Sequence, residues 1–334
     1  MRVKTPPIGG VTVLFAVGVG AAFFASLVIG PADIDAWRIV KGLFGAADET
    51  ANLVAAGIRL PRALLGVMVG AALGLSGAAL QGFLRNPLAE PGLLGVSASA
   101  ALGAVIALYF GVMALFPLAL PVFAVLGAMA AALVIQGLAG RDASMLTLIL
   151  VGVAVSSFAG SLVALALNLA PNPHAALEIA FWLLGSLTDR SMLHVWLALP
   201  FIVAGAGLLL MTGRGLDALS LGEKSAQSMG IDMGRLRMLV VFGTAACVGG
   251  SVAVAGVVGF VGLVVPHLLR PLVGHEPARL LPLSALGGAL IVLIADIGVR
   301  LIPSQGELKL GVLTGIVGAP FFLGLLLKTR SEMR

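Results

Sequence analysis

Charged residues are scarce in this sequence. Asp, Glu, Lys and Arg together make up 10% of the 334 residues, whereas soluble chains carry about 25%. Hydrophobic residues make up 60% and the mean hydropathy is +1.12. This composition excludes an ordinary globular domain. It indicates a membrane protein with many transmembrane helices, and the 45 glycines are typical of such helices.

The sequence also lacks the motifs of enzymes and metal proteins. Its one cysteine, Cys247, excludes an intramolecular disulfide and lies in an apolar run, where we expect it to pack. There is no G-x-x-x-x-G-K-[ST], no H-E-x-x-H and no carboxylate-rich cluster, and the four histidines are widely spaced. We therefore predict no catalytic residue, no metal site and no cofactor bound by this chain. Energy for uphill transport must come from a partner or an ion gradient.

Eight apolar runs approach or exceed the roughly 20 residues that a helix needs to cross a membrane. They cover residues 11–30, 62–84, 92–110, 117–138, 145–169, 192–212, 280–299 and 310–327. The stretch Met238–Leu269 is too long for one ordinary span and short for two. It has several glycines at which it can break: Gly249, Gly250, Gly256, Gly259 and Gly262.

The charged residues on either side of this stretch indicate how many times it crosses the membrane. Arg235 precedes it and Arg270 follows it, and the positive-inside rule places both arginines in the cytoplasm, which requires two passes. We predict ten spans in a single domain, residues 1–334, with both termini in the cytoplasm. The net charge of +5 comes from residues scattered in short loops, which membrane orientation explains better than nucleic-acid binding.

Small residues recur every four positions at Gly66, Gly70, Gly74 and Ala78. Such rows let helices approach closely. We expect them to pack within one bundle; a dedicated dimer face is the alternative.

One acidic residue, Asp296, lies inside a predicted span. An acid in the membrane is a candidate proton carrier. Arg300 lies four residues further on, so the two side chains share a helix face and can neutralise each other. We expect this structural pair, with a proton-coupled role for Asp296 as the alternative.

The largest polar segment is residues 213–235, on the predicted cytoplasmic side. A simple connector needs about five residues, and this segment is longer and carries its own helical pattern. We expect it to dock a cytoplasmic partner. The alternative is an amphipathic helix lying on the membrane surface.

Residues 59–103, 256–300 and 306–327 resemble the FecCD-type permeases, the membrane subunits of ABC importers for siderophores, haem and vitamin B12. The segment "LGEKSAQSMGID" (221–232) is similar to the cytoplasmic coupling segment of that family. The resemblance implies an all-α membrane protein of about ten transmembrane helices, a type II ABC importer permease-like bundle. It also implies a location in the bacterial inner membrane.

The same resemblance implies partners. These are a second permease subunit, two copies of an ATP-binding subunit and a periplasmic substrate-binding protein, with ATP and Mg held by the ATP-binding subunits. A homodimer of permeases is expected, and a close relative as the second subunit stays open.

The resemblance also implies site residues. Those that match a translocation gate are Asn86, Leu88, Met145 and Leu146. For Asn86 and Leu88 the alternative is a tight turn that the neighbouring prolines enforce. Those that match ATPase coupling are Leu221, Gly222, Ala226, Met229 and Gly230.

Three arginines, Arg59, Arg62 and Arg300, match residues that meet carboxylates of the binding protein in that family. Arg–carboxylate pairs have a specific geometry and steer docking. The alternative is snorkelling of these side chains at helix ends.

Together these features predict the permease of an ATP-driven importer, working by alternating access. The expected cargo is an iron complex, either a ferric siderophore or haem, and a corrinoid is the next choice. A proton-coupled secondary transporter using Asp296 and a scaffold that moves nothing are the competing classes.

Overall fold

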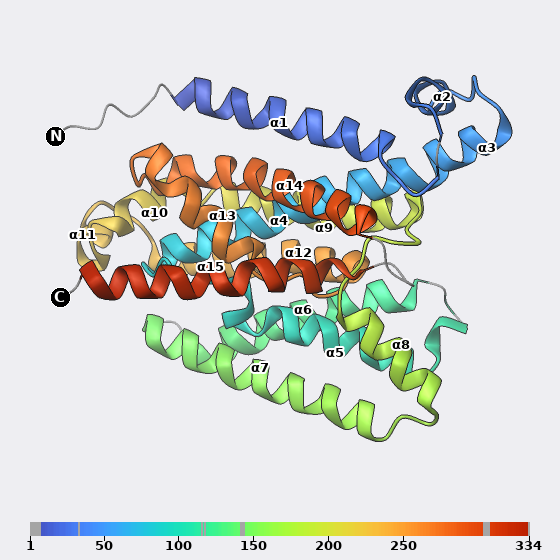
Figure 1. Ribbon diagram of the computed structural model, residues 1–334. Helices are drawn as coiled ribbons and strands as arrows, with labels where there is room; N and C mark the ends of the chain where they lie inside the picture. Colours follow the sequence, from blue (N-terminus) through green and yellow to red (C-terminus); the bar gives the residue numbers. More distant parts are fainter. Residues whose placement is uncertain are drawn as a thin grey trace.

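The computed structural model is a bundle of helices, most of which run roughly side by side (Figure 1). It describes residues 8–32, 34–114, 116, 118–140, 144–302 and 308–332, and this part of the chain contains no strand. The predicted all-α fold is confirmed.

Seven helices in the described residues are long and apolar enough to cross a membrane. They are α1 (Ile8–Val28), the continuous helix α3–η1–α4 (Glu49–Asn52, Leu53–Arg59, Leu60–Phe83), α6 (Ala119–Ala139), α7 (Met145–Asn168), α9 (Met192–Leu210), α12 (Met233–Ala255) and α14 (Pro277–Leu301). Three further helices are apolar over a shorter length: α5 (Val96–Tyr109), α13 (Val261–Leu269) and α15 (Leu310–Glu332). The described residues thus contain an apolar helix at each of the ten predicted spans, and seven of these helices are long enough to cross a membrane.

Short helices cover the two ends of the bundle. At one end lie α10 (Gly213–Ser220) and α11 (Glu223–Ser228), together with the start of α1 and the end of α15 (Figure 1). At the opposite end lie α2 (Ala36–Gly42), α3 and α8 (Pro173–Leu183). The first and last spans thus begin and end on the side of α10 and α11, as the predicted topology requires.

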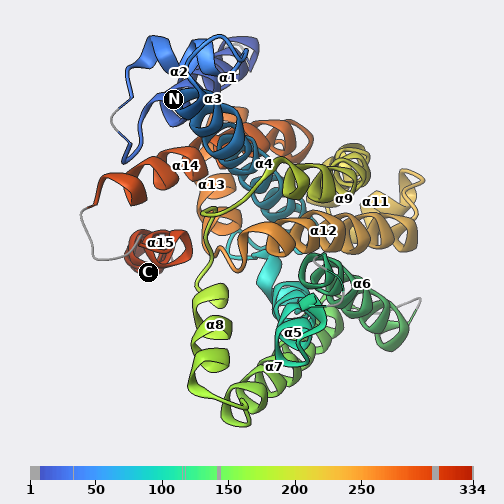
Figure 2. The same ribbon diagram turned by 90° about the vertical axis from the view of Figure 1, so that its right-hand side faces the viewer.

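Helix α4 lies in the middle of the bundle, in contact with α9, α12, α13 and α14 (Figure 2). Its glycines allow this. A Cβ atom on Gly70 would collide with the backbone carbonyl of Gly288 in α14, and one on Gly74 with that of Ser284. The predicted packing of this small-residue row within one bundle is confirmed.

The stretch that was too long for one span breaks after α12. Gly256 and Phe260 both have positive φ angles (68° and 66°), and the backbone between them is not helical. Of the glycines expected to break the stretch, Gly249 and Gly250 stay inside α12. The helical part of the return is the nine-residue α13. Non-helical backbone inside a membrane must be covered by other parts of the protein. One such contact is the hydrogen bond from the Ser186 N–H to the carbonyl of Ala255 (2.7 Å).

The second span begins earlier than residue 62, because helix continues from Glu49. Residues Leu53–Arg59 form a π-helix that ends two residues before Pro61. Proline has no N–H to donate to the preceding turn, and π-helical turns of this kind often occur at functional sites. This turn ends at Arg59, the first of the three arginines singled out above.

Candidate functional site

Arg59 lies at the end of the bundle opposite α10 and α11, and its guanidinium is buried. It donates hydrogen bonds to the carbonyl oxygens of Leu27 (3.0 Å), Val28 (2.6 Å) and Ala32 (2.7 Å). Leu27 and Val28 end α1, where a helix leaves its last carbonyls without partners, and Ala32 lies in the segment that follows. Arg59 therefore ties the end of α1 to the start of α4.

Arg62 and Arg300 both bind Asp296. The Arg62 Nε and Nη2 atoms donate to the Asp296 carboxylate at 2.8–3.0 Å, and the Arg300 Nη2 lies 3.0 Å from Asp296 Oδ2. The predicted Asp296–Arg300 pair is confirmed. Sequence reasoning missed Arg62 as its second partner, because no local spacing links α4 to α14.

Arg300 also reaches α1. It donates to the carbonyls of Ser26 (2.9 Å) and Ile29 (2.8 Å) and to the hydroxyl of Ser26 (2.6 Å). Ser26 is fully buried. In the sequence, the only signal for this contact is that Ser26 lies near the end of one apolar run and Arg300 near the end of another.

The three arginines line one cavity of about 210 Å³ at this end of the bundle. Three arginines and one aspartate leave an excess of two formal positive charges in this cluster. Its other walls come from the segment after α1, the π-helix and Thr188. The structure thus brings together all three residues predicted to dock a partner. Binding of a partner's carboxylate at this cavity stays a prediction.

The predicted coupling segment has a buried half and an exposed half. In α10, Leu216 and Leu219 are fully buried. In α11 and its flanks, Leu221 is 67% exposed and Met229 is 61% exposed. Two exposed apolar side chains on either side of a short helix at the end of the bundle are suited to contact another protein.

The glycines of this segment set its shape. Gly222 has φ 109° and Gly230 has φ 82°, so both adopt conformations that side chains disfavour. Ala226 differs from its neighbours, because it is fully buried. Its side chain packs within the protein, so its role here is to support α11 and not to contact a partner directly.

The predicted gate loop, residues 85–95, is a turn followed by a short 3₁₀ helix, η2 (Pro91–Leu94). The Asn86 side chain accepts a hydrogen bond from the Leu88 N–H (2.9 Å), and its carbonyl accepts one from the Ala89 N–H (3.1 Å). Asn86 therefore holds the turn, and both Asn86 and Leu88 are half-buried. The structural role that the sequence left open for Asn86 is present.

The other two gate candidates lie at the start of α7. Met145 packs partly into the core, and Leu146 is 65% exposed. Helix α7 meets the gate loop further along, where Ser156 donates to the carbonyl of Gly92 (3.2 Å). Eleven residues separate Met145 from Ser156, which is about 16 Å along a helix. The structure thus shows where α7 contacts the gate loop, and a gate formed by Met145 and Leu146 with Asn86 and Leu88 stays a prediction.

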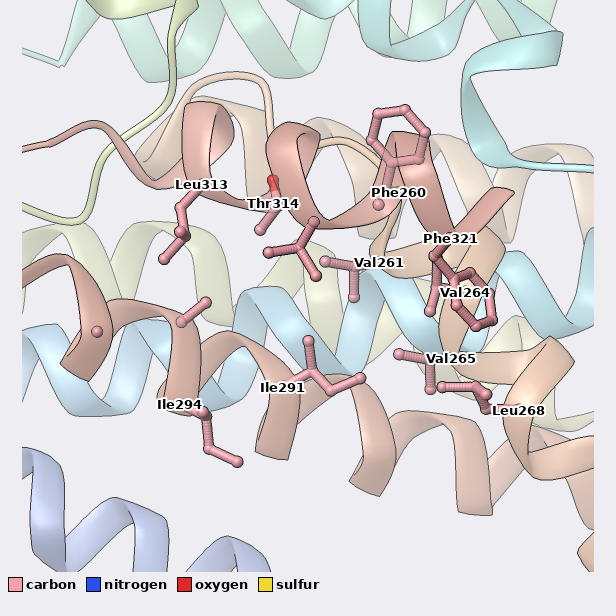
Figure 3. A pocket seen from close by; sticks show the side chains of 14 residues that line it. Phe260, Val261, Val264, Val265, Leu268, Ile291, Ile294, Leu313, Thr314 and Phe321 are labelled. Atoms are coloured by element: carbon pink, nitrogen blue, oxygen red, sulfur yellow. The ribbon is translucent and has the colours of Figure 1, made fainter. Parts of the chain in front are cut away.

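A second cavity, of about 460 Å³, lies between α13, α14 and α15 (Figure 3). Figure 3 shows Val261 and Val264 of α13, Ile291 of α14 and Leu313 of α15 around it. Its one hydroxyl, that of Thr314, donates to the carbonyl of Gly311 (3.1 Å). Because no other side chain that lines this cavity is polar, the cavity offers no specific contact to a charged cargo.

Among the described residues there is no group of three His, Cys, Asp or Glu side chains that could hold a metal ion.

Comparison with known proteins shows which family this chain resembles. The FecCD transport family matches residues 18–328. An uncharacterized ABC transporter permease of Bacillus subtilis (strain 168), YvrB, is 41% identical over 86% of this chain and 82% of its own length. The vitamin B12 import system permease BtuC of Vibrio cholerae is 43% identical over 82% of this chain and 83% of its own. The hemin transport system permease HmuU of Yersinia pestis is 37% identical over 82% and 83%.

The fold agrees with these relatives. A solved structure described as an inward-facing conformation of a putative metal-chelate type ABC transporter superposes with a TM-score of 0.85 at 32% identity, covering 96% of this chain and 99% of that one. The chain belongs to the FecCD transport family and is an ABC importer permease.

Proposed function

We propose that this chain is the permease subunit of an ATP-driven importer that moves a metal chelate into the cytoplasm by alternating access. An iron complex, a ferric siderophore or haem, is the proposed cargo, and a corrinoid is the alternative, because relatives named for haem and for vitamin B12 are similarly close. The observation that carries the proposal is the pair of docking features at opposite ends of one bundle: an arginine-lined cavity and an exposed coupling helix.

The arginine cavity is proposed to receive carboxylates of a periplasmic substrate-binding protein. The cluster has excess positive charge, and opposite charge across an interface steers docking and sets orientation. Because Arg59, Arg62 and Arg300 also hold α1, α4 and α14 together, docking at this cavity would act on the ends of three spans at once.

The exposed side of α11 is proposed to enter a groove on an ATP-binding subunit. Leu221 and Met229 supply the apolar contact, and Gly222 and Gly230 supply the turns on either side of the helix. Two such subunits, which hold ATP and Mg, would supply the energy. This chain then needs no nucleotide site of its own.

The translocation path is proposed to run along the faces that carry Leu88, Met145 and Leu146. Such a path requires a second permease subunit, and a homodimer in the bacterial inner membrane is the simplest assembly. On this reading α10 and α11 lie in the cytoplasm, together with both termini.

Native mass spectrometry of the chain, extracted from membranes of its own host in mild detergent, tests this assembly. We expect two permease copies carrying two ATP-binding subunits, and a retained ligand mass would identify the cargo. A chain that runs alone at every detergent concentration would contradict the proposal.

Uptake measurements separate the energy sources. Vanadate, which inhibits ATPases, should abolish uptake, and so should deletion of the ATP-binding subunit. Uptake that survives both but is lost with a protonophore would instead favour a proton-coupled transporter.

A further inference from the structure

The start of α14 is held by a side chain from the coupling segment. The N–H of Ala278, in the first turn of α14, donates to the Asp217 carboxylate of α10 at 2.8 Å. Helix α14 does not cap itself, because its N-cap residue Glu276 makes no capping hydrogen bond and pairs instead with Arg279 (2.6 Å). A carboxylate at this position also interacts favourably with the helix dipole.

Helix α10 packs tightly at the same junction. A Cβ atom on Gly213 would lie 3.1 Å from the Cβ of Ala278, and the nearest neighbours of Gly82, in the last turn of α4, are Leu216 of α10 and Pro277 of α14. Since Leu216 is fully buried, α10 is wedged between the end of α4 and the start of α14.

From this junction α14 runs as one helix to the opposite end of the bundle (Figure 1). Along the way it is interlocked with α4 through direct backbone contact at Gly70, Gly74 and Gly288. At its far end Asp296 and Arg300 belong to the arginine cluster. Backbones in such close contact cannot slide past each other without collision, so α4 and α14 must move together.

We propose that the α4–α14 pair connects the coupling segment to the arginine cavity as a single body, and that Asp217 is the positioning residue that fastens α10 to it. This inference rests on the proposed function, since it takes α11 as the ATPase contact and the cavity as the binding-protein contact. The gate loop directly follows α4, so a movement of the pair also carries Asn86.

Such a connection has a thermodynamic signature. If two sites are coupled, a ligand at one changes the affinity at the other by the same factor in both directions, typically about 5–150-fold. Nucleotide on the ATP-binding subunits should therefore change the affinity for the binding protein, and this factor depends on Asp217.

The test uses the full complex of permease and ATP-binding subunits in lipid nanodiscs. The Kd of the binding protein is measured with and without a non-hydrolysable ATP analogue and Mg, for the wild type and three variants. In Asp217→Ala we expect the ratio of the two Kd values to approach one. Asp217→Asn keeps an oxygen acceptor and should retain most of the wild-type ratio. Arg214→Ala, which removes an exposed side chain from the same helix, should leave it unchanged.

A covalent staple makes the test independent of how well Asp217→Ala folds. Cysteines at positions 213 and 278, introduced together with Asp217→Ala, face each other across the same junction. Oxidation should restore the nucleotide-dependent ratio and reduction should abolish it within one preparation. The native Cys247 is buried, so it stays in place.

Each part of the inference would be overturned by a different result. A wild-type ratio in Asp217→Ala, or a staple that changes nothing between its oxidised and reduced forms, would overturn the role of Asp217. Wild-type complexes with a ratio of one would overturn the connection itself. Failure of the wild-type permease to assemble with any ATP-binding subunit would overturn the proposed function from which the inference starts.

Discussion

Arg62 and Asp296 lie 234 positions apart in the sequence and form a buried ion pair with an N–O distance of 2.8 Å. The pair joins α4 to α14 near one end of the bundle, and Arg300 binds the same carboxylate. Both oxygens of the Asp296 carboxylate are thus engaged by arginine side chains from two helices. The geometry therefore supports a structural role for Asp296.

Removing one partner of this cluster should destabilise the protein. Asp296→Asn leaves Arg62 and Arg300 without their carboxylate, and breaking a buried ion pair typically costs about 3–5 kcal/mol. Thermal unfolding in detergent measures the loss. Asp48→Asn breaks the exposed pair with Arg38 and should change stability little. Normal stability and assembly of Asp296→Asn, combined with a pH-dependent loss of transport, would revive the proton-coupled alternative.

The glycine contact between α4 and α14 should not tolerate a methyl group. Gly74→Ala would place its Cβ against the backbone of Ser284, and overpacking of this kind costs about 1–3 kcal/mol. The matched control is Gly20→Ala in α1, where no neighbouring atom lies within reach of a Cβ. Equal melting temperatures for the two variants would show that α4 and α14 are not in close contact.

The exposed apolar residues beside α11 should be needed for assembly. Leu221→Asp together with Met229→Asp removes the apolar contact without touching the core, and buried contacts at interface centres can be worth about 2 kcal/mol or more each. Co-purification of the ATP-binding subunit should fall at least about 30-fold, since each 1.4 kcal/mol is tenfold in affinity. Gln227→Ala, exposed on the same helix, is the control.

In contrast to those two residues, Ala226 is fully buried. Ala226→Leu should therefore lower the stability of the isolated permease as well as its assembly. Loss of assembly with unchanged stability would place Ala226 in the interface after all.

Docking at the arginine cavity should weaken with salt. Raising ionic strength from about 0.01 M to about 1 M shortens the Debye length from about 30 Å to about 3 Å. The affinity of the wild-type permease for its binding protein should fall by about tenfold or more, mainly through slower association. Surface plasmon resonance on nanodisc-embedded protein measures both rates. An affinity that is independent of salt would exclude charge steering at this surface.

Local patterns in the sequence predicted several structural features of this protein. Span positions follow from hydropathy, which is a property of consecutive residues, and the Asp296–Arg300 pair follows from helical spacing. The four-residue repeat of small residues in α4 likewise indicated close packing. The second span is longer than predicted, because Arg59 and Pro61 interrupt the apolar run, whereas the helix continues back to Glu49.

The sequence by itself determined the membrane class, the approximate spans and the presence of a polar segment between two of them. The tertiary structure decided which partners meet: Arg62 with Asp296, Asp217 with Ala278, and Arg59 with the last carbonyls of α1. It also decided that Ala226 faces inward while Leu221 faces outward. The reason is physical. Burial of a span depends on its own residues, whereas a contact between distant spans depends on how two helices pack, and local spacing does not contain that information.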